Sequence, residues 1–420
     1  MKFPFRALLL AALPSSGFAL GFRIVDHGAE ATARGGAFAA TADNASAIYY
    51  NPAAITQLDG VQLLLNAYSV NFETSVNPAT SGAPDLDSKY SWETVGDVFL
   101  TWKPKNSPLA FGLGFYSPFG LSVEYPEDAV FRTVGQKGRL QFLTANPVVA
   151  YEVTKQLSVA VGVTFNYSRA KLAQGLGFTP GDTFQLEGDA FGAGVTAGIF
   201  WKPAKQHAFG LQYFGPIDMH YHGHARTRVP AFDLEVEPIR GLKVPIAIGR
   251  TEVTQDMDVT IQFPQTIALG YSFRPADDWN FEADIEWTDW DTLDASVVQL
   301  GKNRKNPLAD RDAALNFKYQ SSFIYEFGVT KTFAGGWRAS VGYLFSENSV
   351  PERQFSPLVP DSYRNVLSGG VGRRYEHWDW FLSYQYAFGP HREIDQDRVP
   401  TAGTYHAQSH AVSVSLGYRF

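Results

Sequence analysis

Residues 406–420 read HAQSHAVSVSLGYRF, and apolar side chains occupy every second position from Val412 to Phe420. The positions between them hold small or polar residues. Successive side chains of a β-strand point to opposite faces, so this segment predicts a strand with one apolar wall and one polar wall. The same alternation recurs in residues 109–115, 157–167 and 279–287.

The lengths of the connections separate two all-β architectures. A soluble sandwich also alternates, but it has no reason to sort its loops by length. When the predicted strands given below are numbered in chain order, long connections follow the odd-numbered strands and short connections follow the even-numbered ones. This pattern is typical of an outer-membrane barrel with both termini in the periplasm. We therefore predict an all-β transmembrane barrel of about 14 antiparallel strands. They are expected at 61–74, 94–103, 109–117, 138–152, 157–170, 186–201, 207–222, 258–273, 279–290, 320–333, 337–346, 364–374, 378–388 and 406–420.

The composition excludes several other classes of protein. The 420 residues contain 35 Lys+Arg against 42 Asp+Glu, and a net charge of −7 argues against nucleic acid as a partner. Cysteine is absent, so disulfide scaffolds and thiol nucleophiles are excluded. Aromatic residues reach 15% while charged residues are only 18%, an unusual composition for a cytosolic enzyme.

Residues 1–19 are predicted to be a signal peptide. A basic start is followed by an apolar run at 7–13 and by small residues at Gly17 and Ala19, which fit a peptidase site. The run is too short to span a bilayer, which takes about 20 apolar residues. A buried N-terminal helix is the alternative. An exported membrane protein without apolar helices has to be a closed barrel.

Residues 20–60 do not alternate and are rich in Ala and Gly. Asn51 is a possible helix cap, and Pro52 fits the first helical turn, where its missing N–H costs nothing. We expect this segment to be a hatch inside the barrel formed by residues 61–420. A flexible periplasmic arm is the alternative.

Several motifs resemble those of a known family. They are Leu20-Gly21-Phe22, Gly35-Gly36-Ala37, Asn51-Pro52-Ala53, the stretch LGFYSPFG at 113–120, the stretch NYSRAK at 166–171 and the terminal Phe420. Spread in order over most of the chain, they resemble the FadL/TodX family of outer-membrane transporters for long-chain fatty acids and other hydrophobic compounds. The resemblance implies a fourteen-stranded barrel plugged by a hatch. It also implies an external groove, an internal pocket, and sideways exit through a gap made by an inward kink of the third strand.

The resemblance also suggests roles for particular residues. Phe22 matches an aromatic residue of the family's internal pocket, although it could simply pack the hatch. The motif Asn51, Pro52 and Ala53 is expected to position the hatch. The kink that forms the lateral gate is expected near Gly112, Gly114, Ser117 and Pro118, although glycines on an inner face often only make room.

A fatty-acid carboxylate needs a cation. The resemblance favours Arg169 as a ligand-binding residue, but Arg169 has the parity of Val163 and Phe165, which are assigned to the lipid face. Arg132 and Arg139, around the loop after the third strand, are the alternatives.

Two further clusters could carry chemistry. His220, His222 and His224 would share one face of a strand, which zinc could use, although a solvated rim also explains them. Glu282, Asp284 and Glu286 lie in a row on one wall, whereas catalytic carboxylates face one another with divergent pKa values. We expect them on a polar lumen face and predict no catalytic residue, no metal and no cofactor.

The sequence thus predicts passive uptake of hydrophobic molecules across the bacterial outer membrane, with long-chain fatty acids as the favoured substrate. Monoaromatic hydrocarbons are the alternative cargo, and a general porin or an outer-membrane lipid hydrolase is the alternative of another class. The expected partners are the hydrophobic ligand, outer-membrane lipid and lipopolysaccharide, and the barrel-assembly machinery, which would read the C-terminal strand ending in Phe420. The sequence leaves the substrate open.

Overall fold

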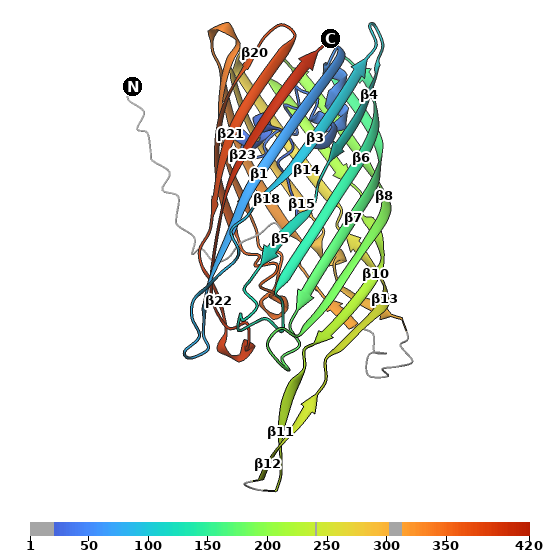
Figure 1. Ribbon diagram of the computed structural model, residues 1–420. Coiled ribbons are helices and arrows are strands. Elements are labelled where there is room, and N and C mark those ends of the chain that lie inside the picture. The colour runs from blue at the N-terminus through green and yellow to red at the C-terminus, as the bar shows by residue number, and fades with distance from the viewer. Residues whose placement is uncertain (1–20, 240–241, 302–312) are drawn as a thin grey trace, which may run out of the picture.

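The structure is a computed structural model and describes residues 21–239, 242–301 and 313–420. In these ranges fourteen antiparallel strands close into a barrel (Figure 1). Closure is made by β23 (Gly403–Arg419), which pairs with β1 (Gly60–Pro78) from Gly403 to Arg419. A closed barrel leaves no unpaired edge in lipid. The predicted fold class is confirmed, while the predicted signal peptide lies outside the described residues.

The remaining wall strands follow in chain order. They are β3 (Trp92–Lys103), β4 (Leu109–Tyr116) continued by β5 (Gly120–Glu124), β6 (Lys137–Thr154), β7 (Leu157–Gln174), β8 (Thr183–Ala204), β9 (His207–Phe214) continued by β10 (Ile217–Val229), β13 (Thr251–Phe263) continued by β14 (Thr266–Ala276), β15 (Trp279–Thr288), β18 (Ser322–Thr332), β19 (Trp337–Ser346), β20 (Arg364–Arg374) and β21 (Trp378–Phe388). Two predicted strands are each divided in two, at residues 215–216 and 264–265, because Pro216 and Pro264 have no N–H to donate to the ladder.

Short strands and 3₁₀ turns lie in the long loops at one end of the barrel. They are β2 (Leu86–Asp87), β16 (Ala295–Leu300), β17 (Ala313–Asn316), β22 (Arg392–Ile394), and the 3₁₀ turns η2 (Trp290–Thr292), η5 (Glu352–Gln354) and η6 (Gln396–Arg398); η4 (Ala334–Gly336) lies in a short turn. The expected loop at 223–257 is instead mostly strand. There β10 and β13 stay paired to Val229 and Thr251, and β11 (Phe232–Ile239) with β12 (Leu242–Ile248) forms a hairpin that projects beyond the barrel (Figure 1).

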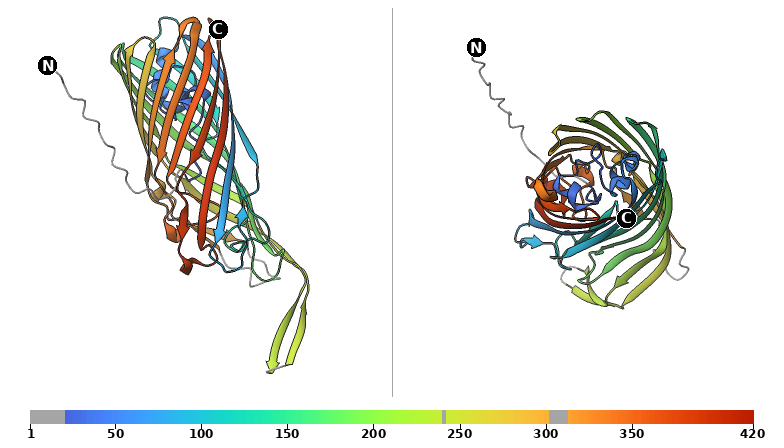
Figure 2. Two further views of the ribbon diagram at one scale, coloured as in Figure 1. Left: turned by 90° about the vertical axis from the view of Figure 1, so that its left-hand side faces the viewer. Right: turned by 90° about the horizontal axis from the view of Figure 1, so that it is seen from above.

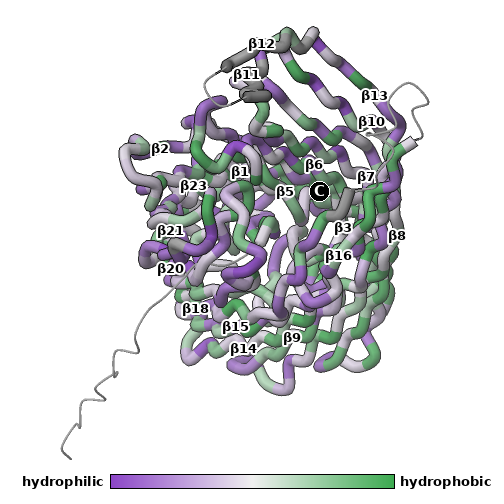
Figure 3. The backbone as a smooth tube through the Cα atoms, turned by 90° about the horizontal axis from the view of Figure 1, so that it is seen from below, coloured by the Kyte–Doolittle hydropathy of each residue, from purple (hydrophilic) through white to green (hydrophobic). Residues whose placement is uncertain are grey.

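The two faces of the wall follow the alternation in the sequence, which Figure 3 displays along the strands. On β7, Val161 and Val163 are exposed on the outside, whereas Thr164 and Asn166 are buried inside. Near the short turns, aromatic rings stack across strands, as in Trp102 on Phe111 with a centroid separation of 5.4 Å. Such a ring of aromatic residues marks a membrane interface.

The N-terminal segment, residues 21–58, lies inside the barrel (Figure 2). It contains α1 (Ala29–Ala33), α2 (Ala47–Tyr50) and η1 (Pro52–Gln57), and its apolar side chains, such as Phe38, Ile48 and Ile55, are fully buried. Among the described residues, no helix is long and apolar enough to cross a membrane.

Close approach of backbones makes this packing possible. Gly35 adopts a positive φ of 66°, which L-residues with side chains avoid. On the facing strand, a Cβ atom at Gly342 would lie 2.0 Å from the carbonyl carbon of Arg34. The segment therefore fits only because the wall presents glycine to it.

A charge placed on the outer apolar face should destabilise the barrel. Val161 is 66% exposed in the middle of the apolar stretch of β7. We expect Val161→Arg to lower the free energy of unfolding by about 2–4 kcal/mol, measured by urea titration of protein in lipid vesicles. Val161→Ile is the control. Equal midpoints for the Arg and Ile variants would mean that this face does not contact lipid.

Candidate functional site

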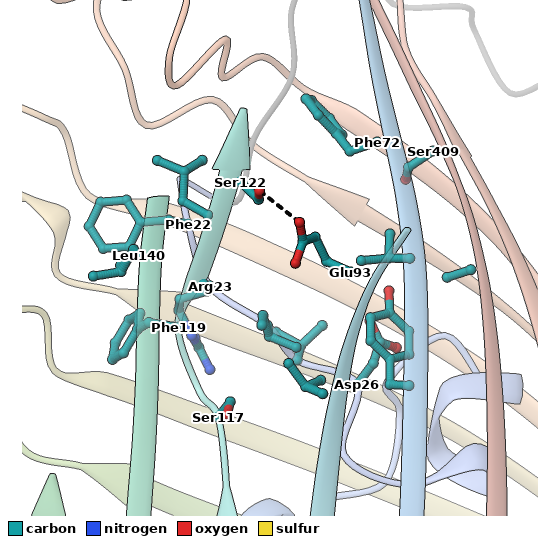
Figure 4. Close-up of a pocket in the computed structure, with 18 of the residues that line it drawn as sticks. Phe22, Arg23, Asp26, Phe72, Glu93, Ser117, Phe119, Ser122, Leu140 and Ser409 are labelled. Carbon is teal, nitrogen blue, oxygen red and sulfur yellow. Dashed lines mark hydrogen bonds between the residues drawn. The ribbon is translucent and has the colours of Figure 1, made fainter. Parts of the chain in front are cut away.

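A cavity of about 590 Å³ lies between the N-terminal segment and the wall. Residues 21–26 line it together with side chains of β1, β3, β5, β6, β20, β21 and β23. Phe22, Phe119 and Leu140 lie together on one side, whereas Asp26 and Ser409 lie on the other, where Phe72 also stands (Figure 4). The cavity can therefore accommodate a molecule with an apolar body and one polar end.

Phe22 belongs to the apolar side. Its ring centroid lies 5.1 Å from that of Trp290, 5.7 Å from that of Phe263 and 6.0 Å from that of Phe119. Because Phe22 both packs in this cluster and lines the cavity, its contact with ligand stays a prediction.

The cavity reaches the wall where the ladder is interrupted. Strand β4 pairs with β3 from Phe111 to Phe115. After residues 117–119, β5 pairs with β6 alone among the described strands, and residues 92–97 of β3 are paired only with β1. The cavity lining includes Leu143 and Tyr167, whose side chains are on the outer face. The cavity thus touches both faces of the barrel wall at this opening.

Backbone groups at the interruption are satisfied from inside. The N–H of Ile24 donates to the carbonyl of Pro118 at 2.9 Å, and the N–H of Gly120 donates to the carbonyl of Phe22 at 2.9 Å. The N-terminal segment therefore replaces β3 as a partner of the chain at this point.

This geometry refines the expected lateral gate. Ser117 and Pro118 do lie at the interruption. Gly112 and Gly114 do not, since both remain in the ladder between β3 and β6. A Cβ atom at Gly112 would lie 2.8 Å from the side chain of Ile48, so the glycines make room for the N-terminal segment.

The carboxylate row of β15 anchors the N-terminal segment. Glu286 forms an ion pair with Arg23, and Glu282 forms one with Arg34 at 2.7 Å. Both side chains of the Arg34–Glu282 pair are at most 1% exposed. The expectation of a polar lumen face is met, and the row has a definite partner.

Backbone amides complete this attachment. The N–H groups of Phe38 and Ala39 donate to one Asp284 oxygen at 2.9 and 2.8 Å. Those of Ala40 and Thr41 donate to one Glu282 oxygen at 2.7 and 3.0 Å. Four successive amides thus converge on two carboxylates.

Asn51 lies between α2 and η1, Pro52 and Ala53 begin η1, and all three residues are buried. The Asn51 amide donates to the carbonyls of Ala39 and Ile199 at 2.9 and 3.0 Å, and its oxygen accepts from the N–H of Ala53 at 3.2 Å. Because Ile199 belongs to β8, Asn51 ties the N-terminal segment to the wall.

Arg169 lies on the outer face and not in the cavity. Its side chain is 53% exposed and pairs with Glu187 on β8 at 2.6 Å. Because side chains alternate along β7, Arg169 lies on the same outer face as Phe165 and Tyr167, two residues after Tyr167. This placement corrects the expectation that Arg169 binds the ligand.

Arg132 is engaged within the loops. Its guanidinium donates to the carboxylate of Asp182 at 2.6 Å, and it does not line the cavity. Burial raises the pKa of Asp182, but hydrogen bonds from the N–H groups of Thr179, Leu176 and Phe178 and from Arg132 outweigh it and lower the pKa to about 2. Arg132 therefore orders a loop.

Arg139 does line the cavity, at the wall opening, where it lies 3.7 Å from Glu93. A further arginine, Arg364, also lines the cavity, and sequence reasoning missed it. The parity of the strand at 364–374 was the available signal, since it places Arg364 on the face of Ser368 and Gly370.

The three histidines share the outer face of β10. His222 and His224 pair with Asp258 and Asp256 of β13, and His220 lies 2.8 Å from the Thr260 hydroxyl. In the described ranges, no group of three or more metal-ligating side chains comes together.

Comparison with known proteins identifies the family. The model for outer membrane protein transport proteins (OMPP1/FadL/TodX) matches residues 10–420. The chain belongs to this family. The long-chain fatty acid transport protein of Salmonella typhi is 22% identical over 388 residues, covering 87% of this chain and 86% of that protein.

Solved structures share the fold. A Pseudomonas aeruginosa FadL homologue gives a TM-score of 0.79 at 17% identity and covers 96% of this chain and 100% of its own. The Pseudomonas putida toluene transporter TodX gives 0.74 at 17% identity with the same coverage. The protein is therefore an outer-membrane transporter of hydrophobic compounds and not an enzyme. The porin and hydrolase alternatives are set aside.

Removing Glu282 should loosen the N-terminal segment. Glu282→Ala leaves the buried Arg34 without its carboxylate, and breaking such a pair costs about 3–5 kcal/mol. We expect faster protease cleavage of the segment and higher ion conductance in planar bilayers. Glu187→Ala, which breaks the exposed pair with Arg169, is the matched control and should change neither. Identical behaviour of the two variants would refute the anchoring role.

The order of the loop at 175–182 should depend on pH. The folded pKa of Asp182 is lower than its ordinary value, so its stabilising effect is full above about pH 4 and is lost as the pH falls toward 2. Amide-exchange protection of this loop, corrected for intrinsic rates, should fall between pH 5 and pH 2. Asp182→Asn should show weak protection at both values, and a wild-type loop equally protected at both would contradict the prediction.

Proposed function

We propose that the protein takes up long-chain fatty acids passively across the outer membrane. The ligand is captured by the external loops, enters the cavity beside Phe22, and leaves sideways between β3 and β5 into the bilayer. The N-terminal segment acts as a hatch that keeps water and ions out of the lumen.

One observation carries this route: the cavity is lined from inside the barrel by Asp26 and Phe119, and on the outer face of the wall by Leu143 and Tyr167. A hydrophobic ligand gains about 0.8 kcal/mol for each buried CH₂ group, so a route through water would be opposed. A lateral passage keeps the chain in apolar surroundings throughout. Along the barrel axis, the N-terminal segment occupies the lumen and is attached to the wall through Glu282 and Asp284.

Monoaromatic hydrocarbons are the second candidate cargo. The aromatic cluster of Phe22, Phe119 and Phe142 offers edges and faces to a small ring. The fold shared with a toluene transporter agrees with this alternative.

Two further partners belong to the proposal. Arg169 and its neighbours stand just outside the apolar band that ends at Tyr167, where lipopolysaccharide head groups would lie. The barrel-assembly machinery would recognise β23 and the exposed Phe420. This residue lies at the end of the barrel where the short turns connect the strands (Figure 1).

Closing the wall opening should stop uptake. The chain has no cysteine, and the Ser122 hydroxyl donates to Glu93 at 2.9 Å across the opening (Figure 4). In cells lacking their own transporter, we expect saturable uptake of labelled oleate by the Glu93→Cys/Ser122→Cys protein. A short bifunctional thiol reagent should reduce that uptake about tenfold or more, because the strands can no longer separate.

The matched control is Val161→Cys/Ala197→Cys, which joins two strands that are already paired. The same reagent should leave its uptake unchanged. Labelled toluene is measured in parallel: toluene uptake without oleate uptake assigns the cargo to the second candidate. Unimpaired oleate uptake after cross-linking of residues 93 and 122 rules out lateral exit, and uptake of neither compound rules out the proposed function.

A further inference from the structure

Three arginines line the cavity, and they differ in how their charge is compensated. Arg23 pairs with Glu286, and Arg139 lies 3.7 Å from Glu93. Arg364 has no carboxylate within 4.0 Å among the described residues. Its one side-chain hydrogen bond there goes to the hydroxyl of Ser409.

Arg364 is the first residue of β20, and Ser409 belongs to β23. A guanidinium carries five N–H donors, so one bond to a serine leaves donors to spare. The side chain is only partly buried and lines the cavity, which makes those donors available to a bound molecule.

Two acidic side chains that line the cavity near Arg364 accept hydrogen bonds from other groups. Asp26 accepts from the Gln385 amide at 2.8 Å. Asp361 accepts from the N–H groups of Ser349 at 3.0 Å and Gly21 at 3.2 Å. Both carboxylates are therefore held by other groups, and among the described residues neither forms an ion pair with the Arg364 guanidinium.

We propose that Arg364 and Ser409 form the head-group site of the cavity and bind the carboxylate of a single-chain amphipathic anion. The inference rests on the proposed function and specifies it: the site selects carboxylates over neutral hydrophobic molecules. A planar guanidinium matches a carboxylate in a two-pronged hydrogen bond. The acyl chain then extends toward Phe22, Phe119 and Leu140 on the opposite side (Figure 4).

The test compares two ligands of equal chain length, oleate and the neutral oleyl alcohol. Their dissociation constants are measured on purified protein by tryptophan fluorescence. Arg364→Met should weaken oleate binding about tenfold or more, the range of a charge-assisted hydrogen bond, and oleyl alcohol binding by less than about twofold. Arg364→Lys should retain part of the difference. Arg169→Met, on the outer face, is the matched control and should bind both ligands like the wild type.

The outcomes separate this inference from the proposed function. Equal weakening of both ligands by Arg364→Met, or no weakening of either, overturns the head-group site while transport stands. Wild-type protein that binds neither ligand overturns the proposed function itself. If Arg364→Met does not fold, Ser409→Ala decides: a selective loss of oleate affinity supports the site, and unchanged affinities for both ligands overturn it.

Discussion

The attachment of the N-terminal segment to the carboxylate row of β15 is the constraint on which the rest of the structure depends. A barrel of fourteen strands is too wide to be filled by its own side chains, so its lumen needs an internal partner. Glu282, Asp284 and Glu286 provide that partner with fixed acceptors, and the segment provides two arginines and four amides. Glu282 and Glu286 are thereby paired with arginines, and one oxygen of Asp284 accepts two backbone amides, since a buried charge needs such partners.

The same attachment holds the N-terminal segment against the interruption in the wall between β3 and β5. Arg23 is fixed to Glu286, and its neighbours Phe22 and Ile24 bond to the chain on either side of Phe119. An interrupted strand would otherwise expose unpaired N–H and C=O groups in a place that excludes water. Residues 22–24 therefore line the cavity and also form hydrogen bonds with the backbone at the interruption of the wall. A movement of these residues would change the cavity and the interruption together.

Local patterns explain what the sequence could predict. Alternation is a property of each strand, so the strand at 378–388 and the outward direction of Val163 follow from residues close in sequence. Parity alone also settles Arg169, because no bulge resets β7 before it. The resemblance to a family suggested a cationic role there, and the regular strand overrides it.

The position of Arg364 in the cavity could not be predicted in the same way. Its environment arises from β20, β23 and the N-terminal segment, which meet only when the barrel closes. For a related reason the sequence left two roles open for Gly112, since the side chain that needs the space, Ile48, is distant in sequence. Contacts across a lumen join residues that are distant in sequence, so the local pattern around either residue does not predict them.

The energies involved suggest how one cavity could serve chemically different ligands. Burial of an acyl chain contributes about 0.8 kcal/mol of binding free energy for each CH₂ group. For a long chain this sum is far larger than the contribution of one charge-assisted hydrogen bond, which is about 1.5–3 kcal/mol. Capacity for hydrophobic molecules therefore comes from the apolar side near Phe22, and an arginine on the polar side can only adjust preference. A relative that lost such a cation would still bind hydrocarbons. Divergence of cargo within one fold thus requires few substitutions, and those are expected where the cavity is polar.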